Sequence, residues 1–444
     1  MTGIDFTKGS ITKNLLLFFF PLLLTNTLQQ AYTFADTVII GRGLGDDALA
    51  AVGNFGTFSF FVTGFSMGIM NGFSVNFSHT FGSGNMTALR KIFGNAAALA
   101  VIVTAVLTAA GSALLYPVMR MMRTSDAIMR DSLVYGYIIF GGLFAAAFYN
   151  LCSALLRAIG DSRTPFTAIC VSSSVNIVLD SLFVYVLKTG VSGPAFATVF
   201  SQLVSGLICV YRLAKSKTVS LRGLSRNDLS LNGASAKSLL KNGIPMACMN
   251  SVTSVGCIFV QGCINGFGAA YTSAYSVCSK YLNLFMLPGI TAGFTSAAFT
   301  GQNCGAGDLI RIRKGTKISC VVAAVSALLL GAALFAFPEQ LARLMLSGDE
   351  AVACTVMFLK RFAFFLVLLN LLFVFRNTVQ ALGKPLVPMC SGIAEMLLRI
   401  PVIMFGLPLI GFKAAAYAEC AAWAGALAIN AFFYLMTVSD KVRQ

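Results

Sequence analysis

Twelve long apolar segments follow one another along the chain, and they constrain its fold more than any other feature. Each is about as long as the roughly twenty apolar residues that a helix needs to cross a bilayer. Only 11% of the 444 residues are charged, whereas soluble proteins carry about a quarter. The alternating strands of a membrane barrel are absent from the sequence. We predict an all-α integral membrane protein with spans near residues 14–40, 48–77, 91–117, 131–156, 164–187, 192–213, 237–264, 270–299, 315–337, 352–378, 385–408 and 412–437.

The net charge of +16 has a topological explanation. In multi-pass membrane proteins, Lys and Arg gather in the cytoplasmic loops, so this charge does not indicate binding to nucleic acid. If both termini lie on one side, the loops on that side are the richer in basic residues, with examples such as Arg90, Lys91, Arg311 and Lys314. We therefore expect a multi-pass protein with both termini in the cytoplasm.

The two halves of the sequence repeat each other. A shift of 223 residues places Gly82-Ser83-Gly84-Asn85 on Gly305-Ala306-Gly307-Asp308, and Pro165 on Pro388. A polar, basic segment at 214–236 separates the halves and is expected to be a cytoplasmic linker. Six spans is an even number, so the two copies point the same way, as in membrane proteins built from parallel repeats. We predict an N-terminal six-helix lobe at 1–213 and a C-terminal one at 237–444.

Two carboxylates lie inside apolar spans of the first half. Asp36 and Asp180 each follow a proline, Pro21 and Pro165, by fifteen residues, or about 22 Å along a helix. If both prolines mark cytoplasmic helix ends, the two carboxylates lie at matching depth. An ionisable group at membrane depth is costly and marks a functional site by default. This pair predicts a cation site.

Several stretches together resemble the multidrug and toxic compound extrusion (MATE) family. They are the run from Pro21 through Gln29-Gln30, Tyr32, Asp36 and Gly41-Arg42 to Gly53, the run Leu155–Pro165, and Gly301-Gln302-Asn303-Cys304-Gly305-Ala306-Gly307-Asp308. The resemblance spans all twelve predicted helices and points to the prokaryotic DinF-like branch. It implies a V-shaped pair of lobes in a prokaryotic cytoplasmic membrane. It also implies export of organic, often cationic, small molecules against inward flow of H⁺ or Na⁺.

The resemblance also implies a cation site in the N-terminal lobe. Carried over residue by residue, that site is Asp36, Asn176, Asp180 and Thr198, and each position holds the expected residue type. Their oxygens are hard ligands suited to a small cation, and two nearby carboxylates in low dielectric are seldom ionised together. The sequence leaves open whether the site takes a proton or Na⁺. Pro21 would be the hinge of a bend in the first helix.

A second branch of the family uses carboxylates in the seventh and tenth spans, where this chain offers only Gln261 and Asn370. Glu395 and Arg399 instead lie four residues apart in the eleventh span. The sequence favours mutual neutralisation of these two charges, and leaves open that Glu395 lines a substrate cavity. Glu419 and Lys280 are expected to pair with each other.

Three functions compete at this point. A cation-coupled exporter is favoured; a lipid-linked-oligosaccharide flippase of the same superfamily is disfavoured because peptidoglycan-precursor flippases usually have fourteen spans. A membrane sensor that moves no solute is disfavoured by the acidic pair. There is no P-loop and no nucleophile–base arrangement, so we expect neither an enzyme nor a cofactor beyond the coupling ion. We expect a monomer whose partners are a small-molecule substrate and the lipid bilayer.

Overall fold

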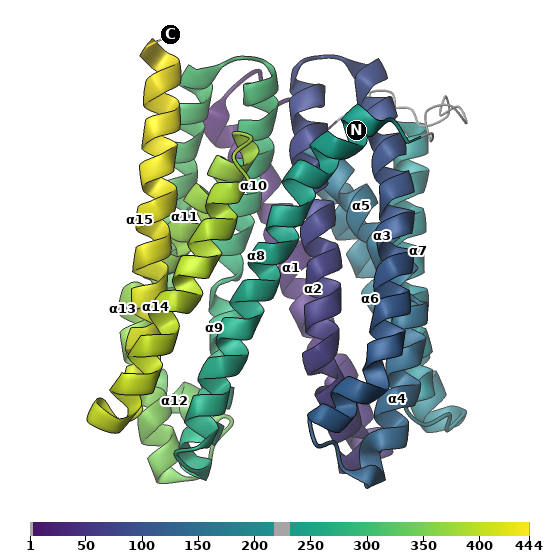
Figure 1. Cartoon of the computed structure of the whole chain (residues 1–444), viewed down its shortest axis with the longest axis vertical. Helices are drawn as coiled ribbons and strands as arrows, with labels where there is room; N and C mark the ends of the chain where they lie inside the picture. Colours follow the sequence, from purple (N-terminus) through teal and green to yellow (C-terminus); the bar gives the residue numbers. More distant parts are fainter. Residues whose placement is uncertain (1–2, 217–230, 444) are drawn as a thin grey trace. The chain divides into compact units, whose positions relative to one another are not determined.

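The computed structural model describes residues 3–216 and 231–443, which are almost entirely helical. Figure 1 labels the elements in chain order. The helices are α1 (Ile11–Leu44), α2 (Asp46–Gly82), α3 (Met86–Met121), α4 (Asp126–Gly141), α5 (Leu143–Ala158), α6 (Arg163–Ser181), the short π-helix η1 (Leu182–Val186), α7 (Ser192–Lys215), α8 (Gly233–Asn265), α9 (Ala269–Phe285), α10 (Leu287–Gly305), α11 (Leu309–Ala336), α12 (Pro338–Arg343), α13 (Asp349–Ala381), α14 (Leu386–Ile410) and α15 (Lys413–Arg443).

The described residues contain eleven helical segments that are long and apolar enough to cross a membrane. Two of them are composite, because α6 continues into η1 and α9 into α10. A twelfth span consists of α4 and α5, which meet at a bend of 43°. The predicted twelve spans and the all-α fold class are therefore confirmed, with the fourth span broken in its middle.

Close packing divides the chain into two compact units. Unit 1 comprises residues 1–5 and 20–247, and unit 2 comprises residues 6–19 and 248–444. Helices α1 and α8 each contribute to both units. The predicted lobe boundaries at 213 and 237 delimit sequence repeats rather than these units, and they stay a prediction. Most of the predicted linker lies outside the described residues, as 217–230 do. The V-shaped arrangement also stays a prediction.

The sequence repeat has the same local structure in both units. Gly84 and Gly307 occupy equivalent turns with φ of 75° and 77°, a backbone conformation that costs a glycine little. The next residue caps the following helix in each case. The side chains of Asn85 and Asp308 each accept a hydrogen bond of 2.9 Å from the backbone N–H three residues later. Such caps satisfy donors that a helix start leaves free.

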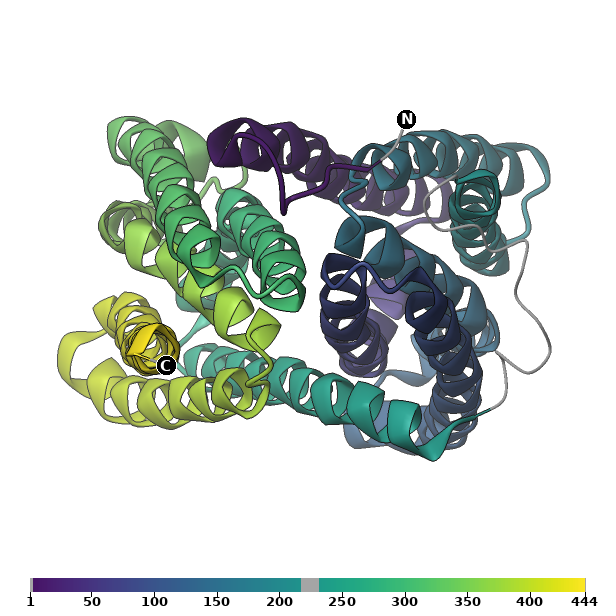
Figure 2. The ribbon, with the colours of Figure 1, turned by 90° about the horizontal axis from the view of Figure 1, so that it is seen from above.

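The helices of each unit run side by side around apolar cores (Figure 2). The core of unit 1 forms two separate clusters, one containing Phe77 and the other Phe140. In unit 2, a large cluster contains Phe358 and Trp423, and a small cluster lies near the end of α13. The divided core of unit 1 is the setting of the candidate site.

Helices α2 and α8 touch at their glycines. A Cβ on Gly68 would lie 2.6 Å from the Cα of Ala247, and one on Gly72 would lie 2.4 Å from the Cα of Gly243. Small residues allow membrane helices to approach this closely. Gly64, one turn earlier on α2, has open space beside it.

Candidate functional site

The carboxyl groups of Asp36 on α1 and Asp180 on α6 lie within hydrogen-bonding reach of each other. Asp180 is fully buried and Asp36 is half-buried. Oδ1 of Asp36 and both carboxyl oxygens of Asp180 receive no hydrogen bond from any donor in the described residues. Buried polar atoms are normally satisfied, so a proton or a cation held between the two carboxyl groups would fit this arrangement.

The face of α6 that carries Asp180 is polar over three turns. Ser172, Asn176 and Asp180 are spaced four residues apart, so they lie one above another on the helix, and all three are buried. Both side-chain atoms of Asn176 lack a hydrogen-bond partner among the described residues, as does the hydroxyl of Ser173. The unsatisfied atoms therefore continue from the acidic pair along α6.

Two tyrosines complete the surroundings of the acidic pair. Tyr32 lies one turn before Asp36 on α1 and interacts electrostatically with it. Tyr135 of α4 is buried, and it interacts electrostatically with both carboxylates and lies near Thr198 of α7. The structure thus brings Asp36, Asn176, Asp180 and Thr198 into one region of unit 1.

Pro21 lies inside α1, immediately after the point between Phe19 and Phe20 where this helix passes from unit 2 into unit 1. Proline removes one helical N–H donor and tends to kink a helix interior. Thr25 donates a hydrogen bond of 2.8 Å to the Pro21 carbonyl. The hinge role of Pro21 stays a prediction.

A cavity of about 270 Å³ adjoins the acidic pair through Tyr32 and Asn176. Its lining contains no Asp, Glu, Lys or Arg, and combines neutral hydrogen-bonding groups with aromatic and apolar side chains. Small-molecule sites have this composition. The lining residues are Gln29, Tyr32, Phe60, Thr63, Gly64, Met67, Ala146, Tyr149, Asn150, Ile169, Ser172, Ser173, Asn176, Ser201, Gln202 and Ser205.

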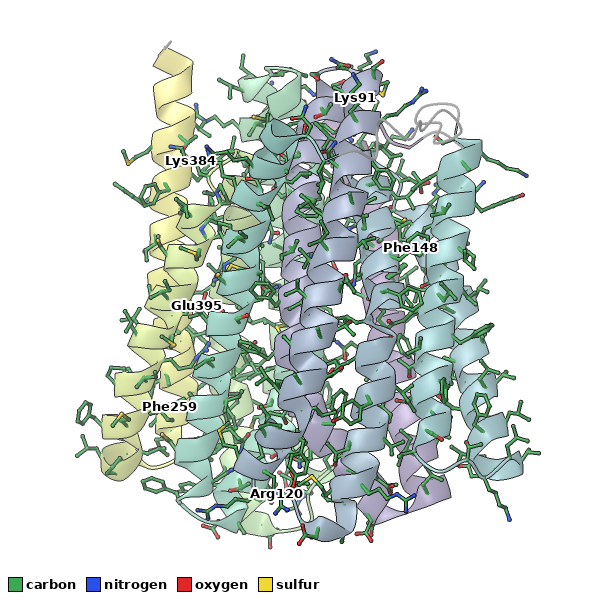
Figure 3. The ribbon with its side chains drawn as sticks, turned by 45° about the vertical axis from the view of Figure 1, so that its right-hand side comes forward. Lys91, Arg120, Phe148, Phe259, Lys384 and Glu395 are labelled. Carbon is green, nitrogen blue, oxygen red and sulfur yellow. The ribbon has the colours of Figure 1, made fainter. Side chains whose placement is uncertain are left out.

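Unit 2 holds buried charges where unit 1 has this polar face. The repeat shift of 223 places Ser172 on Glu395 and Asn176 on Arg399. Glu395 and Arg399 are 3% and 2% exposed, and Figure 3 shows Glu395 about midway along α14. Asp180 itself corresponds to Ile403. The acidic pair is therefore a feature of unit 1 alone.

The predicted pairing of these charges is wrong. Glu395 forms an ion pair with Arg376 of α13 rather than with Arg399. Arg399 pairs with Glu419 of α15 at 2.8 Å, so the expected pairing of Glu419 with Lys280 is also wrong, and Lys280 is exposed. Both ion pairs join α14 to a neighbouring helix, which a pairing along α14 would not do. Glu395 is not among the residues that line the cavity of unit 1, and its cavity-lining role stays a prediction.

The acidic pair with its neighbours can hold a small cation. Carboxylate, amide and hydroxyl oxygens are hard donors, which suit H⁺ or Na⁺ rather than a soft transition metal. The described residues contain no group of three or more His, Cys, Asp or Glu side chains that could hold a metal ion. Two carboxylates supply the charge that one or two monovalent cations would neutralise. This chemistry fits reversible occupancy by a coupling ion.

Sequence reasoning missed four functional or structural partners. Tyr32 had a usable signal, because it lies one helical turn from Asp36. Tyr135, Arg376 and Glu419 reach their partners from other helices, and the spacing of residues along the chain gives no sign of this. The cavity was missed for the same reason, since its lining comes from five helices.

Known proteins match this chain over most of its length. The MatE family model matches residues 21–182 and 245–405, which are the two repeats. The probable multidrug resistance protein YpnP of Bacillus subtilis is 28% identical over 404 residues, covering 90% of this chain and 89% of that protein. The FAD transporter of Shewanella oneidensis is 24% identical over 399 residues, covering 86% and 85%.

Solved structures of MATE transporters share the fold. One in an outward-facing conformation superposes with a TM-score of 0.92 at 20% identity, covering 100% of this chain and 99% of that one. A MATE in the straight conformation gives a TM-score of 0.91 at 20% identity and covers 100% of both chains. With the family model matching both repeats, the chain is a multi-pass membrane protein that belongs to the MatE family of transporters.

Proposed function

We propose that the chain is a secondary antiporter that exports organic, cationic or amphipathic compounds across a prokaryotic cytoplasmic membrane. H⁺ or Na⁺ entering through the acidic pair drives the export. The coupling site consists of Asp36, Asn176, Asp180 and Thr198, and the cavity of unit 1 receives the substrate. The relatives named as multidrug resistance proteins support the substrate class.

The observation that carries this proposal is the acidic pair beside the cavity. Both oxygens of Asp180 are buried without a donor among the described residues. Tyr32 and Asn176, which lie one helical turn from Asp36 and Asp180, belong to the cavity lining. A proton or cation bound by the pair removes charge from a region of low dielectric. In this proposal the ion and the substrate would bind within a few side chains of each other, an arrangement that supports coupling between them.

The energetics are sufficient for export. One charge crossing about 100 mV releases about 2.3 kcal/mol. This sustains roughly a fifty-fold gradient of a neutral solute, because about 1.4 kcal/mol corresponds to a factor of ten. A cationic substrate leaving against the potential needs a second ion or a chemical gradient of the coupling ion.

The proposed topology places both termini in the cytoplasm. On α3, Lys91 and Arg120 lie at opposite ends of the helix (Figure 3), so they are expected on opposite sides of the membrane. Gly45, between α1 and α2, and Lys188, between η1 and α7, would face outward. A single cysteine at Lys188, in a variant that lacks accessible native thiols, should react with an impermeant maleimide in intact cells. Protection of that cysteine until the cells are opened would reverse the topology.

The experiment that tests the function measures transport in proteoliposomes. Ethidium, a permanently charged fluorescent dye, should accumulate against its gradient when a pH gradient or a Na⁺ gradient is imposed separately. Collapse of both gradients with ATP present should abolish this accumulation. Accumulation at full rate without an ion gradient would contradict secondary antiport, and so would its absence under both gradients with a dye shown to bind.

A further inference from the structure

The fourth span differs between the two units. The repeat shift of 223 places the first residue of α4 on the first residue of α13, and the last residue of α5 on the last residue of α13. In unit 2 this span is one continuous helix of 33 residues. In unit 1 it is broken into α4 and α5, which meet at 43°. The same span thus has two geometries in one chain.

The sequence accounts for the break. Gly141-Gly142 lies at the bend, and the corresponding residues of α13 are Phe364-Phe365. Glycine is among the poorest helix formers, whereas phenylalanine is tolerated in a helix interior. Sharp kinks in helices typically arise at glycines or where a side chain inserts into the hydrogen-bond ladder.

A hydroxyl group supports the bend. Thr108 of α3 donates a hydrogen bond of 3.0 Å to the carbonyl of Phe140, the residue before the two glycines. In unit 2 the equivalents of Thr108 and Phe140 are Gly331 and Ala363. There a Cβ on Gly331 would lie 2.8 Å from the Ala363 carbonyl oxygen. The two helices therefore approach each other at the same place in both units, but only unit 1 has a hydroxyl there that donates a hydrogen bond to the carbonyl.

The two arms of the bend contact different parts of the candidate site. On the α4 arm, Tyr135 interacts electrostatically with Asp36 and Asp180 and lies near Thr198. On the α5 arm, Ala146, Tyr149 and Asn150 line the cavity. The bend therefore lies between the residues that face the ion site and the residues that face the substrate cavity.

The ion-site side has a second irregularity that unit 2 lacks. The π-helix η1 begins two residues after Asp180, and its counterpart in unit 2, residues 405–409, is ordinary α-helix within α14. Turns of π-helix occur frequently at functional sites. Both of these irregularities are found in the unit that carries the acidic pair and the cavity.

We propose that the Gly141-Gly142 bend is a hinge that couples the ion site to the substrate cavity. This inference rests on the proposed function and adds to it the element that transmits the coupling. Loading of the acidic pair changes the position of Tyr135, the hinge changes the angle between α4 and α5, and Tyr149 and Asn150 move in the cavity wall. A ligand can shift such an equilibrium only through different affinities for its states.

The test measures coupling rather than transport alone. The dissociation constant of ethidium is determined by fluorescence in detergent, with the acidic pair loaded or unloaded. Loading is varied by acidic against alkaline buffer, and by Na⁺ against choline. The ionisable groups that face the pair are Tyr32 and Tyr135. In the wild type, loading should change this dissociation constant by about fivefold or more, the usual range of allosteric coupling.

Gly141→Ala is the informative variant, because a Cβ at Gly141 meets no atom within 4 Å. Alanine at this position favours a straight helix without a clash, so ethidium should still bind. The ratio of its dissociation constants with the acidic pair loaded and unloaded should fall to about one. Gly53→Ala is the matched control, since a Cβ at Gly53 in α2 also meets open space. It should retain the wild-type effect.

Thr108→Val and Thr108→Ser provide an independent comparison. Valine has the shape of threonine and loses the donor to the Phe140 carbonyl, whereas serine keeps it. Coupling should fall in Thr108→Val and persist in Thr108→Ser. The hinge is contradicted if folded Gly141→Ala keeps the wild-type ion effect, or if the valine and serine variants couple equally. If the dissociation constant of ethidium for the wild type depends on neither pH nor Na⁺, the proposed antiport is contradicted. The hinge, which rests on that proposal, is then contradicted as well.

Discussion

Glu395 bonds to Arg376 of the neighbouring helix α13, although Arg399 follows it by only one turn on α14. Arg399 in turn bonds to Glu419 of α15, and the Tyr275 hydroxyl of α9 lies 3.5 Å from Glu419. The buried charges of unit 2 therefore connect helices rather than turns of one helix. Glu395 and Arg399 occupy the positions at which unit 1 has Ser172 and Asn176, two residues of its cavity.

The first prediction concerns the Arg399–Glu419 pair. Arg399→Gln should lower the free energy of unfolding by about 3–5 kcal/mol, because it leaves the Glu419 carboxylate buried without its partner. Arg399→Gln combined with Glu419→Gln should recover much of that loss. Thermal unfolding of the purified protein in detergent measures both.

The matched double variant is Glu395→Gln with Arg399→Gln. It leaves Arg376 and Glu419 each without a partner, so it should be less stable than Arg399→Gln with Glu419→Gln. Greater stability of the Glu395/Arg399 double variant would show that the pairing follows the i,i+4 spacing after all.

The second prediction concerns the contact of α2 with α8. Gly72→Ala places a Cβ 2.4 Å from the Cα of Gly243, and backbone cannot move aside as a flexible side chain can. Overpacking of this kind typically costs about 1–3 kcal/mol, so the variant should unfold at a lower temperature. Gly56→Ala on the same helix, where a Cβ meets open space, should unfold like the wild type. Equal unfolding temperatures for the two variants would exclude a close helix contact at Gly72.

The third prediction concerns the cavity. Gly64 lines it, and a Cβ there meets no atom within 4 Å, so Gly64→Leu should fill cavity volume without a backbone clash. Ethidium binding should weaken by about tenfold, equivalent to about 1.4 kcal/mol. The effect of ion loading on the remaining binding should persist, because Gly64 is not part of the acidic pair. Unchanged ethidium affinity would place the substrate elsewhere.

The sequence predicts the spans well because each apolar segment must satisfy its own backbone by forming a helix in lipid. The repeat also aligns Gly84 with Gly307, and the structure has equivalent turns there, since a positive φ and a capping side chain are local requirements. The electrostatic interactions of Tyr135 with Asp36 and Asp180 are not local. They depend on which face of α4 turns toward α1 and α6, and an apolar span gives little indication of its inward face.

The broken fourth span shows the same division between local and distant causes. Gly141-Gly142 is visible in the sequence, and its contrast with Phe364-Phe365 emerges once the repeat is aligned. The hydrogen bond from Thr108 of α3 to the Phe140 carbonyl at the bend comes from another helix, and the spacing of residues along the chain gives no sign of it.

The account depends most on Asp36 and Asp180 acting together as the coupling site. Its most direct test is ion-gradient-driven ethidium transport in proteoliposomes that contain equal amounts of wild type, Asp36→Asn or Asp180→Asn. Asparagine keeps the shape of aspartate but cannot take up a proton or offer a charge to Na⁺. We expect each variant to bind ethidium and to lose gradient-driven transport. Wild-type transport rates in either folded variant, under the gradient that drives the wild type, would contradict the account.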